Sequence, residues 1–269
     1  MKQKYFLIIG VLVAAILVIA AAVLVLSPAQ FDLKYRFVPG DNLSYQITTV
    51  DLSQNLSDTK DITMRVIGAD AGNFTLEMVL PSEGRNRTHT EPPVRFSYNE
   101  RGILGSLPLQ KEMLTSSAFM PNLLLYPEKP VRTGDTWQYS PSFNGTMNAS
   151  SFPVEYHFTA SNSYAVKENG TIMTPTGTIP GARIAHTGTY DITFSTSYEN
   201  KMLSTTIKGK FSGDNWVSLE KGYLVTSEYD LETTTILDTS SAMNDPKGLA
   251  LMGQTSKNRI STVLVPNTV

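Results

Sequence analysis

The stretch 223-YLVTSEYDLETTTIL-237 decides the fold class of this chain. Its apolar residues and its polar residues separate onto two faces if the backbone is extended. Tyr223, Val225, Tyr229, Leu231 and Leu237 face one way, while Glu228, Asp230, Glu232 and Thr234 face the other. A two-residue period of this kind is typical of a β-strand with one buried face. Fifteen extended residues would reach about 50 Å, which is long for a globular strand and predicts a bend or bulge.

The same alternation recurs along the chain, and turn sequences separate its copies. Residues 33–37, 43–48 and 74–80 each alternate apolar and polar side chains. Glycine supplies the positive φ that tight turns need. Such turns are predicted at 70–73, 100–102, 168–170 and 220–222.

Only two segments, 109–119 and 243–252, are predicted to be helical. We therefore predict a mainly β protein, with an antiparallel sheet and one or two short helices. The sheet would be a curved sheet, an open barrel or a sandwich.

Three landmarks occur twice in the same order, which indicates an internal duplication. The pairs are 40–45 with 134–139, 66–76 with 166–173, and 100–104 with 220–224. Independent use of favourable turns is the alternative. We predict a first β half at 30–104, a connecting segment with a short helix at 105–130, and a second β half at 131–269. The apolar run Leu123–Tyr126 predicts that the connection packs on the sheet, so both halves form one unit.

Residues 1–29 are predicted to be a membrane anchor. The run from Tyr5 to Leu26 is apolar throughout, and no charge occurs between Lys4 and Asp32. Twenty-two helical residues span roughly 33 Å, enough to cross a hydrocarbon core of about 30 Å. A signal peptide cleaved after Ala29 and a buried soluble helix are the alternatives.

The flanking charges predict the orientation of this anchor. Lys2 and Lys4 precede it, so the N-terminus is expected in the cytoplasm and the large C-terminal part outside. Without these two lysines the chain has 20 basic and 24 acidic residues, a balance that argues against a nucleic-acid partner. The chain contains no cysteine, which excludes a lipidated cysteine, disulfides and thiolate metal sites.

Seven Asn-x-Ser/Thr sequons agree with an exported domain. They are candidate N-glycosylation sites in a host that has the transferase. The asparagines are Asn42, Asn55, Asn73, Asn86, Asn144, Asn148 and Asn169.

The segment Pro130–Trp137 carries a family resemblance. It resembles the Pro-Val-x-x-Gly-Asp-x-Trp signature of exported bacterial and archaeal proteins and lipoproteins of unknown function. Those families also tend to begin with an aromatic-x-x-Gly-Asp-x-apolar-x-Tyr strand, as Phe37–Tyr45 does here. Their lipoprotein members carry an anchoring cysteine, which this chain lacks. The resemblance implies an exported β protein and no activity.

Catalytic motifs are absent from the sequence. It has no Gly-x-Ser-x-Gly elbow, no Gly-x-Gly-x-x-Gly and no P-loop. His89 is predicted in an exposed loop, His157 on a polar strand face, and His186 on an apolar face as a buried, hydrogen-bonded residue. Asp230 and Glu232 share a face that we interpret as solvated rather than catalytic.

We therefore predict a non-enzymatic binding or cell-surface module without a cofactor or metal. Its partner would be a glycan or an envelope component. The alternative is a module of the lipoprotein-carrier type, since a curved sheet rich in Tyr and Phe can hold a lipid or other apolar ligand. A hydrolase assembled from distant residues is the third hypothesis.

Overall fold

The computed structural model describes residues 30–79, 93–106, 124–149, 152–174, 177–198, 201–238 and 251–266, which form one continuous antiparallel sheet. Its strands are β1 (Asn42–Asp51), β2 (Leu56–Asp70), β3 (Asn73–Val79), β4 (Val94–Asn99), β5 (Leu104–Ser106), β6 (Thr136–Tyr139), β7 (Ser142–Ala149), β8 (Phe152–Thr174), β9 (Gly177–Tyr198), β10 (Lys201–Ser218), β11 (Leu224–Asp238) and β12 (Leu251–Val265).

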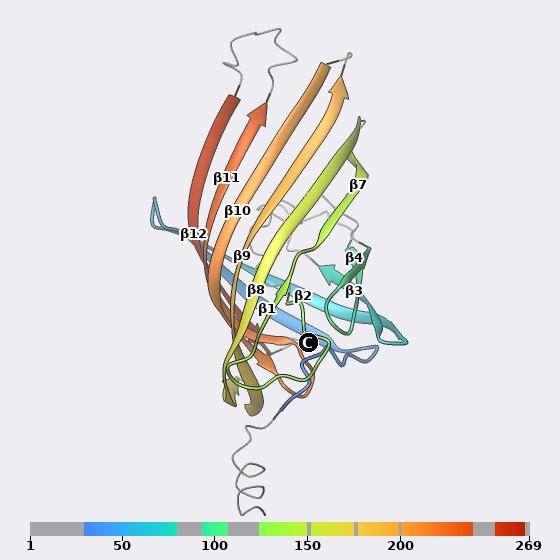
Figure 1. Cartoon of the computed structure of the whole chain (residues 1–269), viewed down its shortest axis with the longest axis vertical. Coiled ribbons are helices and arrows are strands. Elements are labelled where there is room, and N and C mark those ends of the chain that lie inside the picture. The colour runs from blue at the N-terminus through green and yellow to red at the C-terminus, as the bar shows by residue number, and fades with distance from the viewer. Residues whose placement is uncertain are drawn as a thin grey trace, which may run out of the picture.

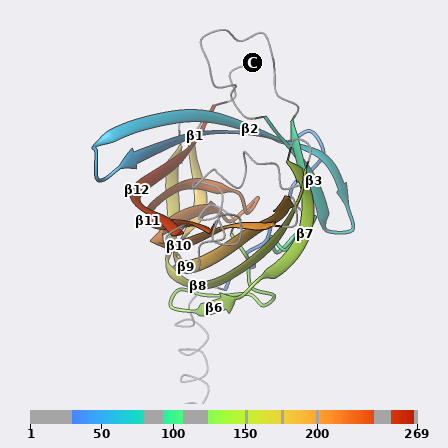
Figure 2. The same ribbon diagram turned by 90° about the horizontal axis from the view of Figure 1, so that it is seen from above.

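The sheet curls into a half-barrel. The order of its strands is β5-β4-β3-β2-β1-β12-β11-β10-β9-β8-β6, and β7 also pairs with β8. Strands β8 to β12 are tall and stand next to one another, while β1 and β2 cross below them (Figure 1). Seen from above, β8 to β12 form an arc, with β1 and β2 along the opposite side (Figure 2). The pairing of β1 with β12 joins the first and last strands along the chain in the interior of the sheet.

The predicted mainly β, antiparallel fold with a curved sheet is confirmed. The described residues contain no helix, and within them no segment meets the length and apolarity needed to cross a membrane as a helix. The predicted anchor at 1–29 and the predicted helix at 109–119 lie outside the described residues. The helix predicted at 243–252 is wrong at its end, because Leu251 and Met252 begin β12; 243–250 lie outside the described residues.

The stretch that predicted the fold forms β11. Tyr229 and Leu231 are buried, while Glu228, Asp230 and Glu232 are exposed. The expected irregularity is also present, because the register with β10 shifts between Trp216 and Val217. Leu237 departs from the predicted burial and is 38% exposed near the end of the strand.

Residues 33–37 are not a sheet strand, although the sequence predicted one. Leu33, Tyr35 and Phe37 are buried as expected. The backbone of this segment is instead bonded to two turns: Tyr35 N–H donates to the carbonyl of Glu100, and Arg36 N–H donates to that of Lys221. An alternating pattern reports which side chains are buried, and it does not specify the hydrogen-bond partner of the backbone.

Two turns of the predicted duplication have the same geometry. In each, a glycine at φ 95° precedes a strand and donates its N–H to a valine carbonyl of the strand that pairs with it, β2 for Gly40 and β8 for Gly134. The N–H of the same valine donates to the backbone carbonyl of the aspartate that follows the glycine. The carboxylate of this aspartate accepts the N–H of the residue three positions before it. The residues are Gly40, Val66, Asp41 and Val38 in one turn, and Gly134, Val166, Asp135 and Arg132 in the other. Both valines precede a register shift in their strands.

The buried side chains form two clusters. The lower cluster joins β1–β4 to the lower ends of β8–β11 through residues 33–37 and Leu124–Tyr126. The predicted packing of Leu124, Leu125 and Tyr126 on the sheet is thereby confirmed; Leu123 lies outside the described residues. The upper cluster lies between the tall strands.

Arg101 connects three segments at the lower end of the domain through an ion pair and two hydrogen bonds to backbone carbonyls. The Arg101 guanidinium donates to the Asp32 carboxylate at 2.8 Å and to the carbonyls of Leu33 and Glu128 at 2.6 and 3.2 Å. Partial burial acts to raise the pKa of Asp32, but the hydrogen bond and charge of Arg101, followed by those of Lys34, lower it overall.

Replacing Asp32 by asparagine is expected to remove a pH-dependent part of the stability. Since the folded pKa of Asp32 is the lower one, its stabilisation is present above the unfolded pKa of about 3.9 and is lost as the pH falls through the folded pKa. Urea unfolding at pH 7 and at pH 3 should show a deficit of D32N at pH 7 that shrinks at pH 3. A deficit that is the same at both pH values would contradict this assignment.

Candidate binding surface on the concave face

The concave face of β8 to β10 is largely apolar. Alternate residues of a strand point to the same side, and on these three strands the inward ones are mostly aromatic or aliphatic. The buried members of the cluster are Phe158, Tyr190, Ile192, Phe211, Tyr229, Leu231 and Ile260. Further up β11 and β12 the inward positions are polar, as at Thr233 and Asn258. The outward residues of β11 and β12 include charged side chains such as Asp230 and Arg259.

Four glycines on this inner face lie opposite aromatic residues of the neighbouring strand. A Cβ atom built on any of them would overlap the facing ring. The pairs are Gly145 with Tyr156, Gly188 with Phe211, Gly209 with Tyr190, and Gly213 with Tyr229. Each ring thus lies across the glycine backbone, a packing known to support glycine in sheets. The four rings form a thin apolar layer on the concave side of the sheet, which we call the floor, and the sheet can curl around it.

The floor becomes more accessible towards the upper ends of the strands. Ile192 is buried, whereas Phe194, two residues further along the same face, is half-buried. Tyr156 on β8 and Ile207 on β10 are also half-buried. We call Tyr156, Phe194, Ile207 and Leu237 the apolar rim.

A buried polar network crosses the floor around His186, which is fully buried. Its Nδ1 lies 2.9 Å from the hydroxyl of Tyr229, and its Nε2 lies 3.0 Å from Oδ1 of Asn162. The Asn215 amide donates to the same Tyr229 hydroxyl. The ring of Tyr164 stacks on the imidazole at a centroid distance of 4.2 Å. The predicted burial and hydrogen bonding of His186 are confirmed.

The partners determine the direction of each hydrogen bond. The Asn162 amide group donates to the Tyr139 carbonyl, which turns its Oδ1 towards His186, so Nε2 carries the proton. Nδ1 then accepts from the Tyr229 hydroxyl, which itself accepts from Asn215. Burial raises the pKa of Tyr229 well above its usual value and keeps this phenol protonated. In each of these hydrogen bonds a donor faces an acceptor, while among the described residues Oδ1 of Asn215 is buried without a hydrogen-bond partner.

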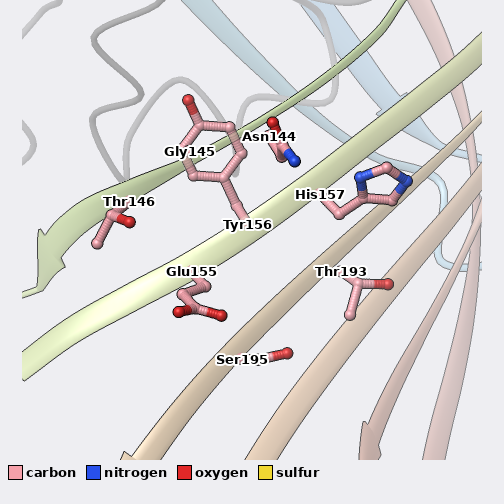
Figure 3. Close-up of a pocket in the computed structure, with 8 residues that line it drawn as sticks. All are labelled: Asn144, Gly145, Thr146, Glu155, Tyr156, His157, Thr193 and Ser195. Atoms are coloured by element: carbon pink, nitrogen blue, oxygen red, sulfur yellow. The ribbon is translucent and has the colours of Figure 1, made fainter.

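Of the described histidines, His157 is not brought to His186. His157 is exposed on the outer face of β8, as predicted, while His186 points inward from β9. His89 lies outside the described residues. His157 borders a shallow outer depression of about 420 Å³ with Glu155, Thr193 and Ser195 (Figure 3).

The predicted pair of carboxylates belongs to a charged outer surface. Asp230 and Glu232 are both exposed, and Arg259 donates to Asp230 at 2.9 Å. Arg183 similarly bridges Glu168 and Asp214. These contacts support the interpretation of a solvated strand face. Within the described residues, no group of three His, Cys, Asp or Glu side chains is arranged to hold a metal.

The sequons whose side chains are described are all exposed. They are Asn42, Asn55, Asn73, Asn144 and Asn169. Asn55 lies in the turn between β1 and β2 with φ 55°, and Asn144 borders the outer depression. Asn148 lies on β7, where its side chain is not described, and Asn86 lies outside the described residues.

Most of this surface could not be predicted from the sequence. Asn162, Asn215 and Tyr229 come from three different strands and carry no local signal of a common network. The glycine–aromatic pairs had a signal, since Gly188 and Gly209 interrupt otherwise continuous strand patterns. An isolated glycine within a strand indicates a bulge or a close approach by another group.

Comparison with known proteins leaves the family of this chain open. No family model matches the sequence, and no curated protein matches it. Two solved structures show a low likeness, each with a TM-score of 0.33, covering 88% of this chain and 98% of theirs. One is from Bacteroides fragilis NCTC 9343, is 9% identical and is described as exported with a YmcC-like fold. The other is from Parabacteroides distasonis ATCC 8503, is 12% identical and is described as a lipoprotein. At this level of similarity neither structure assigns a function to the chain.

Proposed function

We propose that this protein is a single-pass membrane protein whose extracytoplasmic β domain binds an elongated apolar ligand, such as an acyl chain, without catalysing a reaction. The observation that carries the proposal is the concave floor of aromatic side chains, which ends in the half-buried apolar rim. Ligand sites are lined mostly by apolar and aromatic side chains. The His186 network is buried within the floor, where it links four neighbouring strands, β8 to β11.

The location is supported by sequence and by the exposed sequons. The run Tyr5–Leu26 and the preceding lysines favour an anchor with its N-terminus in the cytoplasm. The five sequons with described side chains are accessible to a glycosylating enzyme. The absence of cysteine suits a domain that is held by a helix rather than by a lipid.

Lack of enzymatic activity is supported by the arrangement of titratable groups. A nucleophile normally needs a base within hydrogen-bond reach. His186 is occupied on both nitrogens by Tyr229 and Asn162, and His157 projects from the opposite face of the sheet.

We also propose that the two halves arose by duplication. The matching turns at Gly40–Asp41 and Gly134–Asp135 repeat the three hydrogen bonds described above and a fourth, in which the aspartate N–H donates to the carbonyl three residues earlier. Favourable turn sequences alone would account for the glycine and the aspartate. They would not account for the same valine contact and the same register shift in the paired strand.

The binding proposal predicts selective labelling of the apolar rim. The full chain in lipid nanodiscs would be irradiated with a diazirine-bearing palmitic acid, and the modified peptides would be identified by mass spectrometry. Adducts are expected on peptides that contain Phe194 and Ile207. Ile207→Asn is expected to lower these adducts roughly tenfold, because losing part of one apolar contact costs about 1–2 kcal/mol.

The matched control for this experiment is Lys208→Asn. Lys208 adjoins Ile207 on β10, points to the outer face and pairs with Asp191 at 3.4 Å. It should leave the adducts on the rim unchanged. Adducts confined to the Tyr5–Leu26 segment would contradict an apolar ligand and favour a protein or glycan partner.

A further inference from the structure

The chain enters the domain at its lower end. Phe31 is held there by two backbone hydrogen bonds with Val131, of 2.9 and 3.0 Å. The apolar run ends at Leu26, so five peptide steps separate it from a fixed residue. Five residues span at most about 18 Å. If the run crosses a membrane, the lower end of the domain must lie close to the bilayer.

A hairpin tip lies at the same end. The pairing of β9 with β10 stops at Gly181 and Ser218, and that of β8 with β6 stops at Ala165 and Thr136. Among the described strands, the ends of β8 and β9 beyond Gly181 form ladder pairs with each other. We call residues 171–174 and 177–180 the basal tip. Its Thr174 borders a depression of about 340 Å³ together with Lys221 and Leu264, so the tip stays close to neighbouring segments of the lower end.

Hydrogen bonds connect the basal tip to the entering chain. The Arg36 guanidinium donates to the Leu219 carbonyl at 3.1 Å, and Leu219 N–H donates to the Pro180 carbonyl at 3.0 Å. The lower ends of β8 and β9 also lie at the lower end of the molecule in Figure 1. We call the segment between Leu26 and Phe31 the tether. The tether enters the sheet at the same end at which the basal tip lies.

The chemistry of the basal tip suits a lipid interface. No charged residue occurs from Thr171 to Ala182. Met173 is 88% exposed, the most exposed of the large apolar side chains among the described residues. Ile172 is buried over Gly181, which stiffens the hairpin behind Met173. The nearby Lys221 is paired with Asp41 at 3.5 Å.

We propose that the basal tip inserts Met173 into the headgroup region of the membrane that holds the anchor. This inference rests on the proposed tether. The contact is apolar rather than electrostatic, because the tip carries no basic residue to attract anionic lipid. Two contacts at one end, the tether and the tip, hold the tall strands upright. The apolar rim then lies at the end far from the bilayer.

The test uses single-cysteine labelling, which the cysteine-free chain makes clean. Met173→Cys and Met202→Cys would each be labelled with the fluorophore NBD in the full chain, reconstituted in phosphatidylcholine vesicles. Met202 is the matched control, since it is also an exposed methionine, at 61%, but lies at the upper end of β10. The readouts are quenching by headgroup spin-labelled lipid and by aqueous iodide.

The label at 173 is expected to be quenched by the spin-labelled lipid at least threefold more than the label at 202, and by iodide at least threefold less. A second pair places the label at Thr178, the exposed cross-strand partner of Met173. Adding Met173→Asp to T178C should lower its lipid quenching towards that of the label at 202.

Alkaline extraction of the vesicles separates the two proposals. If the chain resists extraction while the labels at 173 and 202 respond alike to both quenchers, the tether stands and the contact is overturned. If alkali releases the chain, the tether is overturned, and the contact that rests on it falls as well.

Discussion

Replacing Gly222 by alanine is expected to prevent the domain from folding stably. Gly222 has φ 77°, a conformation that disfavours side chains other than glycine. A Cβ atom there would also overlap the Lys34 carbonyl oxygen, which belongs to the backbone of the entering segment. Its own carbonyl accepts the Tyr126 hydroxyl at 2.6 Å in the lower cluster. We expect a loss above about 4 kcal/mol, the range reached when strain and core disruption combine.

Gly134→Ala separates the two causes. Gly134 has φ 95°, but nothing lies within 4 Å of the position of its Cβ. This variant should lose only about 1 kcal/mol through backbone strain. Gly253→Ala, with ordinary φ and open space, should be close to neutral. Urea unfolding of the full chain in detergent, followed by the fluorescence of Trp137 and Trp216, measures all three. Equal losses at Gly222 and Gly134 would show that the contact with Lys34 is unimportant.

Replacing His186 by alanine is expected to cost about 3–5 kcal/mol of unfolding free energy, because it opens a cavity and leaves buried polar groups unpaired. The hydroxyl of Tyr229 and Oδ1 of Asn162 would both lose their partner on the imidazole. The stacking of the Tyr164 ring would be lost as well. The damage should spread across the floor, since these residues come from β8, β9 and β11.

His157→Ala provides the matched control. His157 lies on β8, next to β9, but is exposed on the outer face, so its loss should stay within about 0.5 kcal/mol. Tyr229→Phe tests the network without a large cavity. It leaves Nδ1 of His186 and the Asn215 amide unpaired and should cost about 2–3 kcal/mol. Similar stability of H186A and H157A would mean that the network does not hold the strands together.

Much of the fold could be predicted because strand periodicity is local. The inward and outward positions of β11, the burial of His186 and the turns at 70–73, 100–102 and 220–222 all follow from residues within a few positions of each other. The turn predicted at 168–170 is wrong, because these residues continue β8 and pair with β9. The prediction failed at residues 33–37. The burial of their alternate side chains was predicted correctly, but their backbone is hydrogen-bonded to turns and not to a neighbouring strand. It also failed at Leu251 and Met252, which join β12 because β11 lies beside them.

The candidate site was less predictable than the fold. Tyr190 and Gly209 are 19 residues apart, and their contact depends on the register of β9 with β10. Tyr229 and His186 are 43 residues apart and are separated by β10. Nothing in either local sequence favours its partner over another aromatic or polar residue.

The sequence by itself determined the chemistry of each segment: a long apolar run at the N-terminus, alternating strands, glycine turns and a chain without cysteine. These properties depend on the side chain and backbone preferences of neighbouring residues. Only the tertiary structure decided that β1 pairs with β12, that four glycines lie under aromatic rings, and that an uncharged hairpin tip lies at the end where the chain enters. Those features depend on which distant strands pair and in which hydrogen-bond register. A single strand could form its backbone hydrogen bonds equally well with many partners, and the choice is made only when the whole sheet is assembled.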